Sequence, residues 1–526
     1  MDLGTVLRWT AERYPRHRAV GGKYPLTYAQ WDARTDRLAR ALAELGVQPG
    51  DRVAFLLAGG EPMASLHLAA QKLGAVSVPL SIRFGPEELA YCLRDAAPAL
   101  MVTDTSTTDT AEAALSDERP LARAHAGEPA EAPPGVRPIE RVAANEPGGA
   151  LSTRVAEGDI SVMLYTSGTT GKPKGVPRTH SAEHQAAVAH LLQSRQEPFA
   201  TTLGVMPMFH TMGLRSLLAS VISAGTWVPQ VRFSPEEALE LIIREGVSTL
   251  YLVPTIYWGL LRTGRLAEAT SVRKLAYAGA SMTPTLAEQL TAALAPEVFI
   301  NHFGSTEIYT FTISPDVAAK PGCAGRAGVF TRVRLVDPEP GASPSDVVGE
   351  GEQGQIAISM DSPEAFGGYW NRPDADAKSI RDGWYFPGDL ATTDEDGDLW
   401  VAGRVDDMIN SGGENIYPGE IEDTLARCPA VADVVVAGLP DDRWGQAATA
   451  FFVPAPGMTP QHAATVLTHF VREQSGLPSL KRPKRLIAVE QIPKSAVGKI
   501  LRRELTTGNY VPLAEVPSEA MTPSRR

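Results

Sequence analysis

Hydrophobic positions in the first part of the chain recur with two different periods. A helical stripe that begins at Thr35 ends at Gly46, and the strand-like run VAFLL follows it. A second helical segment, Glu61 to Leu73, leads into the apolar run AVSVPL. The segment GPEELAYCLRDAAPALMVTD repeats this order, and Pro86 with two glutamates marks its helix start. Helices that alternate with short apolar strands predict a largely parallel sheet covered by helices.

Three later apolar runs, VSTLYLVPT, VRKLAYAGASM and EVFINHFGSTE, each end in small or polar residues. Parallel strands present such carboxyl ends at one edge of a sheet, and ligands bind there. We therefore expect the residues after these strands to contribute to a binding site. Residues 122–149 are rich in Ala, Pro, Glu and Gly without a clear period, which predicts a surface excursion.

A chain of 526 residues is too long for one ordinary core. From Ala324 to Val401, short apolar runs with frequent Gly, Pro and Asp predict antiparallel β structure. About a hundred residues beyond Arg404 show an alternation of their own, enough for a small α+β domain. We predict an α/β protein with three parts: a large N-terminal body of layered α/β subdomains plus a β-rich subdomain (1–405), a small α+β C-terminal domain (406–507) and a flexible tail (508–526).

Composition and charge argue against a membrane protein, a secreted protein and a general nucleic-acid-binding protein. Hydrophobic residues make up 43% and charged residues 21%, and no run approaches the ~18 apolar residues that cross a bilayer. Arg8, Glu12 and Arg13 interrupt the N-terminal segment, so we expect no signal peptide, no membrane contact and a cytoplasmic location. The net charge of −12 disfavours general binding of nucleic acid. The three cysteines are widely separated and predict neither a zinc site nor disulfides, so small molecules are the expected partners.

The segment YTSGTTGKPKGVPRTH, Tyr165 to His180, concentrates glycines, hydroxyls and lysines. Glycines let a backbone approach an anion closely, and hydroxyls and lysines donate to phosphate oxygens. The spacing differs from a Walker A loop, because only two residues separate Gly168 from Gly171 and Pro173 replaces the hydroxyl that binds Mg²⁺. A solvated linker is the alternative, and the strand-like run SVMLY before the loop disfavours it. The segment predicts a polyphosphate ligand, and therefore a nucleotide enzyme.

Seven segments resemble, in this order, the motifs of one family: YTSGTTGKPKG, MPMFHTMG, AYAGASM, HFGSTE, GWYFPGDL, GRVDDMINSGGENIYPGEIE and PKSAVGKILRREL. The family is the adenylate-forming superfamily of acyl- and aryl-CoA synthetases, carrier-protein adenylation domains and firefly luciferase. The resemblance covers nearly the whole chain. Within the family, DDMINSGGENIYPGEIE, DDRWGQ and KRPKR are most similar to bacterial aryl-CoA ligases of the halobenzoate type.

The resemblance implies a reaction in two steps. ATP with Mg²⁺ activates a carboxylic acid to acyl-AMP and releases pyrophosphate, and CoA then takes the acyl group as a thioester. Because the carboxylate and the phosphates repel each other, the site must neutralise charge and hold the reactants together. The implied Mg²⁺ ligands are Glu307 and Thr166, and Thr306 would donate to the α-phosphate. The implied phosphate-loop residues are Thr166, Ser167, Gly168, Thr169, Thr170, Gly171 and Lys174.

The resemblance also implies how the nucleoside and the reacting groups are held. Asp389 and Arg404 match the residues that bind the ribose hydroxyls, and Phe303 matches the aromatic residue that packs against adenine. Lys499 matches the catalytic lysine that bridges the carboxylate and the α-phosphate. Without that match, a lysine in a basic segment is ordinarily solvated. The remaining implied AMP-binding residues are Gly279, Ala280, Ser281 and Gly304, and the basic residues expected to be solvated are Lys494, Arg502 and Arg503.

In this family the C-terminal domain rotates between the two steps about a hinge, which Asp406 matches. The rotation would remove Lys499 and bring a Gly-Gly face to the site. Trp444 resembles a residue that stacks on the CoA adenine, although packing against its own domain is the alternative. Leu480 departs from the phenylalanine of the aryl-CoA ligases, which weakens the predicted adenine contact. The implied CoA-binding residues are Arg83, Gly412, Gly413, Trp444 and Arg482.

The implied acid pocket combines small, aromatic and polar residues. It comprises His210, Thr211, Met212, Gly213, Tyr251, Ala278, His302, Tyr309 and Thr310, and His210 is also a candidate catalytic residue. An alkyl chain would leave buried hydrogen-bonding groups at four of these positions unpaired, at ~1–3 kcal/mol each. We therefore predict a hydroxylated or amino-substituted aromatic acid. A structural role for His302 is the alternative.

Other functions stay open at this point. An adenylating enzyme that loads a phosphopantetheine carrier protein, or a medium-chain fatty acyl-CoA ligase, would share most of these motifs. Trp444, Arg83 and Arg482 favour CoA over a carrier protein. A non-catalytic sensor would have no reason to keep Lys499 and Glu307 together, and nothing specific indicates luciferase-type oxidation. A monomer and a homodimer are equally compatible with the sequence.

Overall fold

The computed structural model describes residues 1–115, 121–147, 149, 151, 153–166, 172–339, 341–407, 409–411, 414–416, 418–441, 444–478, 481–494 and 500–516. The chain forms two compact units. Unit 1 comprises Met1–Val333 and Ile358–Tyr385, and unit 2 comprises Arg334–Ala357 and Phe386–Arg526. The predicted boundary between residues 405 and 406 stays a prediction.

A seven-stranded sheet in unit 1 has the order β7-β6-β5-β3-β4-β8-β9. Its neighbouring strands are parallel except β8 and β9, which form an antiparallel pair. The strands are β3 (Arg52–Leu56), β4 (Val76–Pro79), β5 (Leu100–Thr103), β6 (Ala122–His125), β7 (Arg137–Pro138), β8 (Ile160–Thr166) and β9 (Lys174–Thr179). The sheet confirms the predicted alternation of helices and strands.

The predicted surface excursion over residues 122–149 is wrong. Strands β6 and β7 extend the sheet at one edge, and Ala124 and His125 are fully buried. A strand of four residues is too short to show a period, and its pairing with β5 rather than its own pattern stabilises it.

A nine-stranded sheet in unit 1 has the order β16-β15-β14-β13-β12-β10-β11-β1-β2. Its central strands are parallel, whereas β2, β15 and β16 pair antiparallel. The loops that follow β12, β13 and β14 therefore leave from the same edge, as predicted. The strands are β1 (Arg18–Val20), β2 (Leu26–Thr27), β10 (Thr201–Gly204), β11 (Thr226–Pro229), β12 (Thr249–Leu252), β13 (Lys274–Tyr277), β14 (Val298–Phe303), β15 (Thr312–Ser314) and β16 (Arg326–Ala327).

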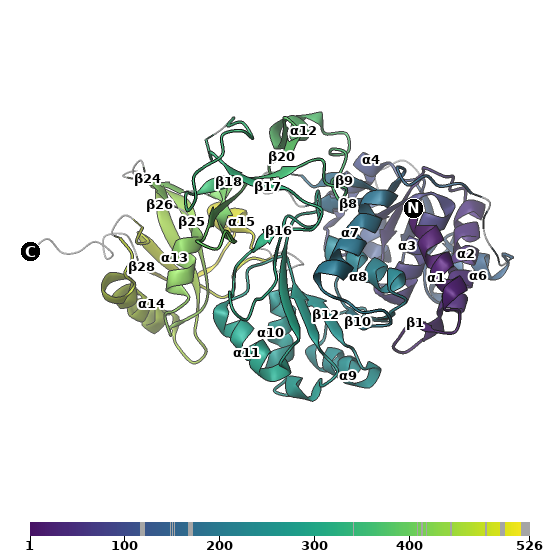
Figure 1. The fold of residues 1–526 in the computed structure, drawn as a ribbon, viewed down its shortest axis with the longest axis horizontal. Coiled ribbons are helices and arrows are strands. Elements are labelled where there is room, and N and C mark those ends of the chain that lie inside the picture. The colour runs from purple at the N-terminus through teal and green to yellow at the C-terminus, as the bar shows by residue number, and fades with distance from the viewer. Residues whose placement is uncertain are drawn as a thin grey trace, which may run out of the picture. The chain divides into compact units, whose positions relative to one another are not determined.

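Local capping signals start several helices of unit 1. Thr27 and Gln30 form a capping box at α2, Thr179 caps α7, and Pro86 occupies the first turn of α4. Helices α1, α2, α3 and α6 pack together (Figure 1). The helices are α1 (Leu3–Arg13), α2 (Tyr28–Glu44), α3 (Gly60–Leu73), α4 (Pro86–Ala96), α5 (Thr108–Leu115), α6 (Ile139–Ala144), α7 (His180–Gln193), α8 (Thr211–Ile222), α9 (Pro235–Glu245), α10 (Pro254–Arg262), α11 (Pro284–Leu294) and α12 (Pro373–Ser379).

The predicted antiparallel β region is confirmed, and the boundary between the units falls within two of its strands, β17 (Val333–Val336) and β18 (Gly354–Ser359). In unit 1 the end of β18 pairs antiparallel with β20 (Trp384–Tyr385), which also pairs with β19 (Ile380–Arg381). In unit 2 the start of β18 pairs with β21 (Asp389–Thr393), which forms a hairpin with β22 (Leu399–Arg404).

The remainder of unit 2 is an α+β fold, as predicted. The long hairpin of β25 and β26 is its centre, β27 lies parallel to β26, and α13 packs against β25. Within the predicted tail, β28 pairs with β27, and residues 517–526 lie outside the described residues. The elements are β23 (Ile409–Ser411), β24 (Glu414–Ile416), β25 (Val431–Asp441), β26 (Gly445–Pro454), β27 (Arg485–Val489), β28 (Pro512–Val516), α13 (Pro418–Leu425), α14 (Pro460–His469) and α15 (Arg502–Thr506).

All three cysteines are buried and none forms a disulfide: Cys92 and Cys323 lie in unit 1, and Cys428 lies in unit 2. Burial raises the pKa of Cys92 to about 12 and also raises the pKa of Cys428. No described helix combines the length and the apolar character that crossing a membrane requires.

Candidate active site

Strands β8 and β9 flank the predicted phosphate loop. Thr166 at the end of β8 lies opposite Lys174 at the start of β9. A Cβ atom at Gly175 would lie 3.1 Å from both Met163 Sδ and Trp370 Cβ, so a larger residue there would require these side chains to shift. The central loop residues Ser167, Gly168, Thr169, Thr170 and Gly171 lie outside the described residues.

Two lysines of the loop rest on aromatic rings. Lys174 Nζ lies 3.9 Å from the centroid of the Tyr369 ring, and Lys172 Nζ lies 5.1 Å from that of Tyr91. Cation–π contacts of this kind hold an ammonium group without neutralising its charge. Lys174 therefore keeps a positive charge at the position where the loop rejoins the sheet.

Glu307 lies beyond the end of β14, and its residue is only 6% exposed. The hydroxyl of Tyr369 donates to Glu307 Oε1 over 2.6 Å. Burial raises the pKa of Tyr369, and the charge of Glu307 raises it further, so the phenol stays protonated and acts as donor. Carboxylate and hydroxyl oxygens are the ligands that Mg²⁺ prefers, so the residue types of Glu307 and Thr166 fit this cation.

Arg178 fixes the backbone around Glu307. Its guanidinium donates to the carbonyl oxygens of Thr306 (3.2 Å), Glu307 (3.1 Å) and Glu364 (2.9 Å), and it pairs with the buried carboxylate of Glu183. Sequence reasoning missed Arg178, although it stands in the motif segment PRTH directly after the loop. A buried arginine that binds three carbonyl oxygens gives the Thr306–Glu307 turn a defined conformation.

The loops after β13 and β14 hold the predicted adenine-binding residues. Gly279 has a φ of +85°, a conformation that favours glycine. A Cβ atom at Gly304 would lie 2.1 Å from the carbonyl oxygen of Tyr309, so only glycine fits there. The ring of Phe303 is half-buried and contacts Phe311 edge-on, with the centroids 5.4 Å apart. Ala278 and Ala280 are half-buried, and Gly279 and Ser281 are exposed.

The polar side chains of the predicted acid pocket contact a residue that sequence reasoning missed. Arg215 donates to Thr310 Oγ1 (3.0 Å) and to the Tyr251 hydroxyl (3.4 Å), and it lies 3.4 Å from His302 Nδ1. Its guanidinium is also 3.7 Å from the buried carboxylate of Glu364. The expectation that an alkyl substrate would leave these three groups unpaired is therefore wrong, because Arg215 on α8 already engages them.

Two further residues of the predicted pocket, Tyr309 and His302, lie near buried arginine side chains. The ring of Tyr309 contacts both Arg178 and Arg215, with their guanidinium carbons 3.8 Å and 5.1 Å from its centroid. Burial lowers the pKa of His302 well below its usual value, and the neighbouring His190 and Arg215 side chains lower it further. His302 is therefore a neutral, buried side chain.

His210, a predicted pocket residue, is the N-cap residue of α8. Burial lowers the pKa of His210 to about 4, and the charge of Arg83 lowers it further. The next residue, Thr211, begins α8, and Met212 is buried. A Cβ atom at Gly213 would lie 2.3 Å from the carbonyl oxygen of Pro207, so this turn also requires glycine.

In unit 2, the predicted ribose-binding residues are neighbours. Asp389 and Arg404 lie opposite each other on β21 and β22, and Arg404 NH1 donates to Asp389 Oδ1 over 3.2 Å. Arg404 NH2 also donates to the carbonyl oxygen of Pro387 over 2.7 Å. The hairpin thus presents a carboxylate and a guanidinium side by side.

The predicted CoA-binding residues of unit 2 also have partners there. Lys484 Nζ lies 5.1 Å from a ring centroid of Trp444, and the Trp444 backbone N–H donates to Asp441 Oδ1. Arg482 donates to the carbonyl oxygen of Leu477. The predicted hinge residue Asp406 lies in the short helix η3 (Val405–Asp407). Gly412, Gly413, Leu480 and Lys499 lie outside the described residues.

Arg502 is not solvated, contrary to prediction. Its guanidinium binds both carboxylate oxygens of Glu422 at 2.7 Å, and NH1 donates to Asp407 Oδ2 at 3.1 Å. The prediction was wrong because the partners come from η3 and α13, which the pattern of a basic segment does not reveal. Arg503 is exposed, as expected.

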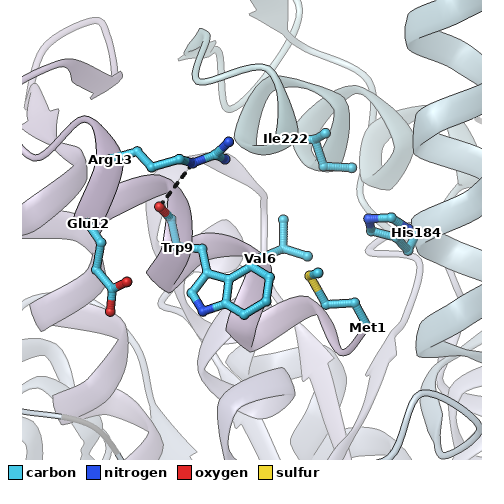
Figure 2. A pocket seen from close by; sticks show the side chains of 7 residues that line it. All are labelled: Met1, Val6, Trp9, Glu12, Arg13, His184 and Ile222. Carbon is cyan, nitrogen blue, oxygen red and sulfur yellow. Dashed lines mark hydrogen bonds between the residues drawn. The ribbon is translucent and has the colours of Figure 1, made fainter.

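A cavity of about 460 Å³ lies beside α1 (Figure 2). Its lining comprises Met1, Val6, Trp9, Glu12, Arg13, His184 and Ile222. Within the part of the chain that the structure describes, this lining shares no residue with the predicted site.

Comparison with known proteins identifies the family. The model of the AMP-binding enzyme family matches residues 7–370, and that of the AMP-binding enzyme C-terminal domain matches residues 420–499. The chain therefore belongs to the AMP-binding enzyme family. The predicted superfamily is confirmed, and so is the predicted enzyme class, an AMP-forming acid–thiol ligase.

Three relatives align with almost the whole chain. A feruloyl-CoA synthase of an Amycolatopsis species is 35% identical, over 92% of this chain and 94% of its own. A long-chain fatty acid–CoA ligase of Mycobacterium tuberculosis is 31% identical (96% and 98%), and a 4-chlorobenzoate–CoA ligase of an Arthrobacter species is 30% identical (95% and 94%). The names of these relatives refer to both aromatic and aliphatic acids.

A solved structure, ATP-bound MatB from Rhodopseudomonas palustris, is similar to this fold with a TM-score of 0.85. It is 27% identical and covers 96% of this chain and 99% of its own. The predicted fold class, a large α/β body with a small α+β part, is confirmed by this similarity and by the sheets described above.

Proposed function

We propose that this enzyme joins a hydroxylated or amino-substituted aromatic carboxylic acid to CoA, through an acyl-adenylate formed from ATP with Mg²⁺. The arrangement of Glu307, Tyr369 and Lys174 carries the proposal. It places a buried carboxylate near a fixed ammonium group beside the loop, which suits a cation and a polyphosphate. Mg²⁺ would neutralise phosphate charge there, with Glu307 and Thr166 as its protein ligands.

Two observations support an aromatic acid with a polar substituent. The feruloyl-CoA and 4-chlorobenzoate relatives are named for aromatic acids. The predicted pocket also borders a buried cation, Arg215, whose neighbours are Tyr251 and Thr310. A hydroxyl or amino group can exchange hydrogen bonds with such a cluster, whereas an alkyl chain gains nothing from it. The fatty acid–CoA relative supports the rival proposal, an aliphatic acid.

For the second step we propose that residues 406–507 act as a mobile domain with Asp406 as hinge. Lys499 would serve adenylate formation, and the Gly412–Gly413 face would serve thioester formation. Trp444, Arg482 and Arg83 would contact CoA through a ring face and two cations. The tail would be residues 508–526.

The experiment is a pyrophosphate-release assay with benzoate, hydroxybenzoates, aminobenzoates, naphthoate, octanoate and no acid. We expect the highest kcat/KM for a hydroxybenzoate or an aminobenzoate. Fastest turnover of octanoate would reject the aromatic proposal while leaving acid activation in place.

The acceptor is tested separately, with isolated acyl-adenylate and either free CoA or a phosphopantetheine carrier protein. Thioester formation with free CoA is expected, and Trp444→Ala is expected to raise the KM for CoA without changing pyrophosphate release. Acyl transfer to the carrier protein alone would reject CoA as the acceptor. An unchanged KM would reject the proposed role of Trp444.

A further inference from the structure

The segment from Phe366 to Trp370 connects the two halves of the proposed nucleotide site. The backbone N–H of Phe366 donates to the carbonyl oxygen of Glu307 over 2.9 Å. Four residues later, the N–H of Trp370 donates to the carbonyl oxygen of Gly175, also over 2.9 Å. The segment from Phe366 to Trp370 is thus hydrogen-bonded both to the turn that carries Glu307 and to strand β9, which follows the phosphate loop.

Tyr369 makes the corresponding side-chain contacts. Its hydroxyl binds Glu307 Oε1 at 2.6 Å, and the face of its ring carries Lys174 Nζ at 3.9 Å. We propose that Tyr369 is a positioning residue, which orients the carboxylate of Glu307 toward a divalent cation and holds Lys174 beside the phosphates. This inference rests on the proposed function.

The surroundings of Tyr369 fix its ring. Its backbone N–H donates to Asp376 Oδ1 over 2.8 Å, and the ring packs edge-on against Phe366 with centroids 5.0 Å apart. The residue is only 6% exposed, and Tyr385 neighbours its hydroxyl. A side chain held on several sides can orient a carboxylate without losing much rotational freedom on ligand binding.

The hydrogen bond has a specific consequence for metal binding. A phenol that donates to Oε1 of a carboxylate restricts its rotation, and Oε2 would then be the oxygen that could bind a cation. Partners of this kind typically change metal affinity by about 10- to 100-fold. The contact between the Tyr369 ring and Lys174 Nζ restricts the ammonium group at the end of a flexible side chain. This contact requires the aromatic ring but not the hydroxyl.

The two contacts can be separated by substitution. Tyr369→Phe keeps the ring for Lys174 and removes the hydroxyl, whereas Tyr369→Leu removes both contacts. The direct measurement is the affinity of the enzyme for Mn²⁺ in the presence of a non-hydrolysable ATP analogue. Electron paramagnetic resonance detects the bound Mn²⁺, and no carboxylic acid substrate is added. We expect Tyr369→Phe to weaken Mn²⁺ binding about tenfold or more and to leave analogue affinity nearly unchanged. Tyr369→Leu should weaken analogue affinity as well.

In the activity assay, Tyr369→Phe should need about tenfold more Mg²⁺ for half-maximal pyrophosphate release, while thioester formation from supplied acyl-adenylate stays the same. Tyr28→Phe is the matched control, because its buried hydroxyl donates to the carbonyl oxygens of Ser220 and Gly225, remote in sequence from the proposed site. It should lower the melting temperature to a similar extent without changing the metal dependence.

The outcomes separate this inference from the proposed function. Unchanged Mn²⁺ affinity in Tyr369→Phe overturns the role assigned to the hydroxyl, even if the enzyme activates aromatic acids. Equal analogue affinity in the Phe and Leu variants overturns the role assigned to the ring. If no acid supports pyrophosphate release, the proposed function fails, whereas the metal-binding comparison still decides the role of Tyr369.

Discussion

Arg215 is the single residue that most changes the interpretation of the acid pocket. It has a side-chain exposure of 1%, as does Glu364, and it contacts three polar groups that sequence reasoning had left for the substrate. An arginine in the largely apolar helix α8 gives no local sign of this role. These three predicted pocket residues are therefore held together by a buried cation.

Removing that cation should destabilise unit 1. Arg215→Met leaves the carboxylate of Glu364 buried without its closest cation, which we expect to cost about 3–5 kcal/mol of unfolding free energy. The double variant Arg215→Met/Glu364→Gln should recover part of that loss. Urea denaturation of the three proteins measures both effects, and additive losses in the double variant would contradict the pairing.

Glu307 should matter for chemistry more than for folding. Glu307→Gln keeps an oxygen that can accept from Tyr369 but removes the negative charge, so we expect pyrophosphate release to fall about 100-fold. The melting temperature should change by only a few degrees. The same variant should convert supplied acyl-adenylate to thioester at the normal rate. A rate of pyrophosphate release close to wild type would exclude Glu307 as a metal ligand.

At the scale of elements, Arg502 connects three parts of unit 2. It lies on α15, binds the carboxylate of Glu422 on α13, and binds Asp407 in η3, the short helix that contains the predicted hinge. Burial raises the pKa of Glu422, whereas the charge of Arg502 lowers it. The arginine thus stabilises a carboxylate that is costly to bury.

We expect Arg502→Gln to lower the unfolding free energy of unit 2 by about 2–4 kcal/mol, since Glu422 would lose its bidentate partner. Arg503→Gln is the matched control, because Arg503 is the exposed neighbour on the same helix and should change stability by less than about 0.5 kcal/mol. Thermal melting with a probe in unit 2 measures the difference. Equal melting temperatures for both variants would rule out a stabilising role of the Arg502 cluster.

At the scale of the whole molecule, several buried histidines make the fold sensitive to acid. Burial lowers the pKa of His67 to about 3, of His180 to about 4 and of His190 to about 3. In the unfolded chain each imidazole takes up a proton near pH 6.5, whereas the folded chain resists protonation until the pH is far lower. Their contribution to stability is therefore complete above pH 6.5 and declines as the pH falls toward 4.

Each of these histidines should reduce the unfolding free energy by about 1.4 kcal/mol per pH unit below pH 6.5. Denaturation at pH 7, 6 and 5 measures the slope. In His67→Gln the side chain cannot titrate, so the slope of the unfolding free energy against pH should decrease by the contribution of one proton. A slope identical to that of the wild type would contradict the neutral, buried state of His67.

Structural features that depend on residues close together in the sequence could be predicted from the sequence alone. The helix start at Pro86, the alternation of helices and strands, and the motif loops after β13 and β14 all follow from local patterns. The contacts that organise the site could not. Tyr369 lies 62 residues from Glu307, and Arg215 lies 95 residues from Thr310, so only the folded chain brings these pairs together.

The burial of all three cysteines has a practical consequence. Reagents that label thiols should leave Cys92, Cys323 and Cys428 unmodified in the native protein, because the groups are inaccessible and the raised pKa of at least two of them disfavours the reactive thiolate. One new cysteine in place of exposed Glu236 and another in place of exposed His462 would then accept a donor and an acceptor dye selectively. Energy transfer between these dyes, recorded with ATP, with acid and with CoA in turn, would test whether the distance between the two units changes during a catalytic cycle.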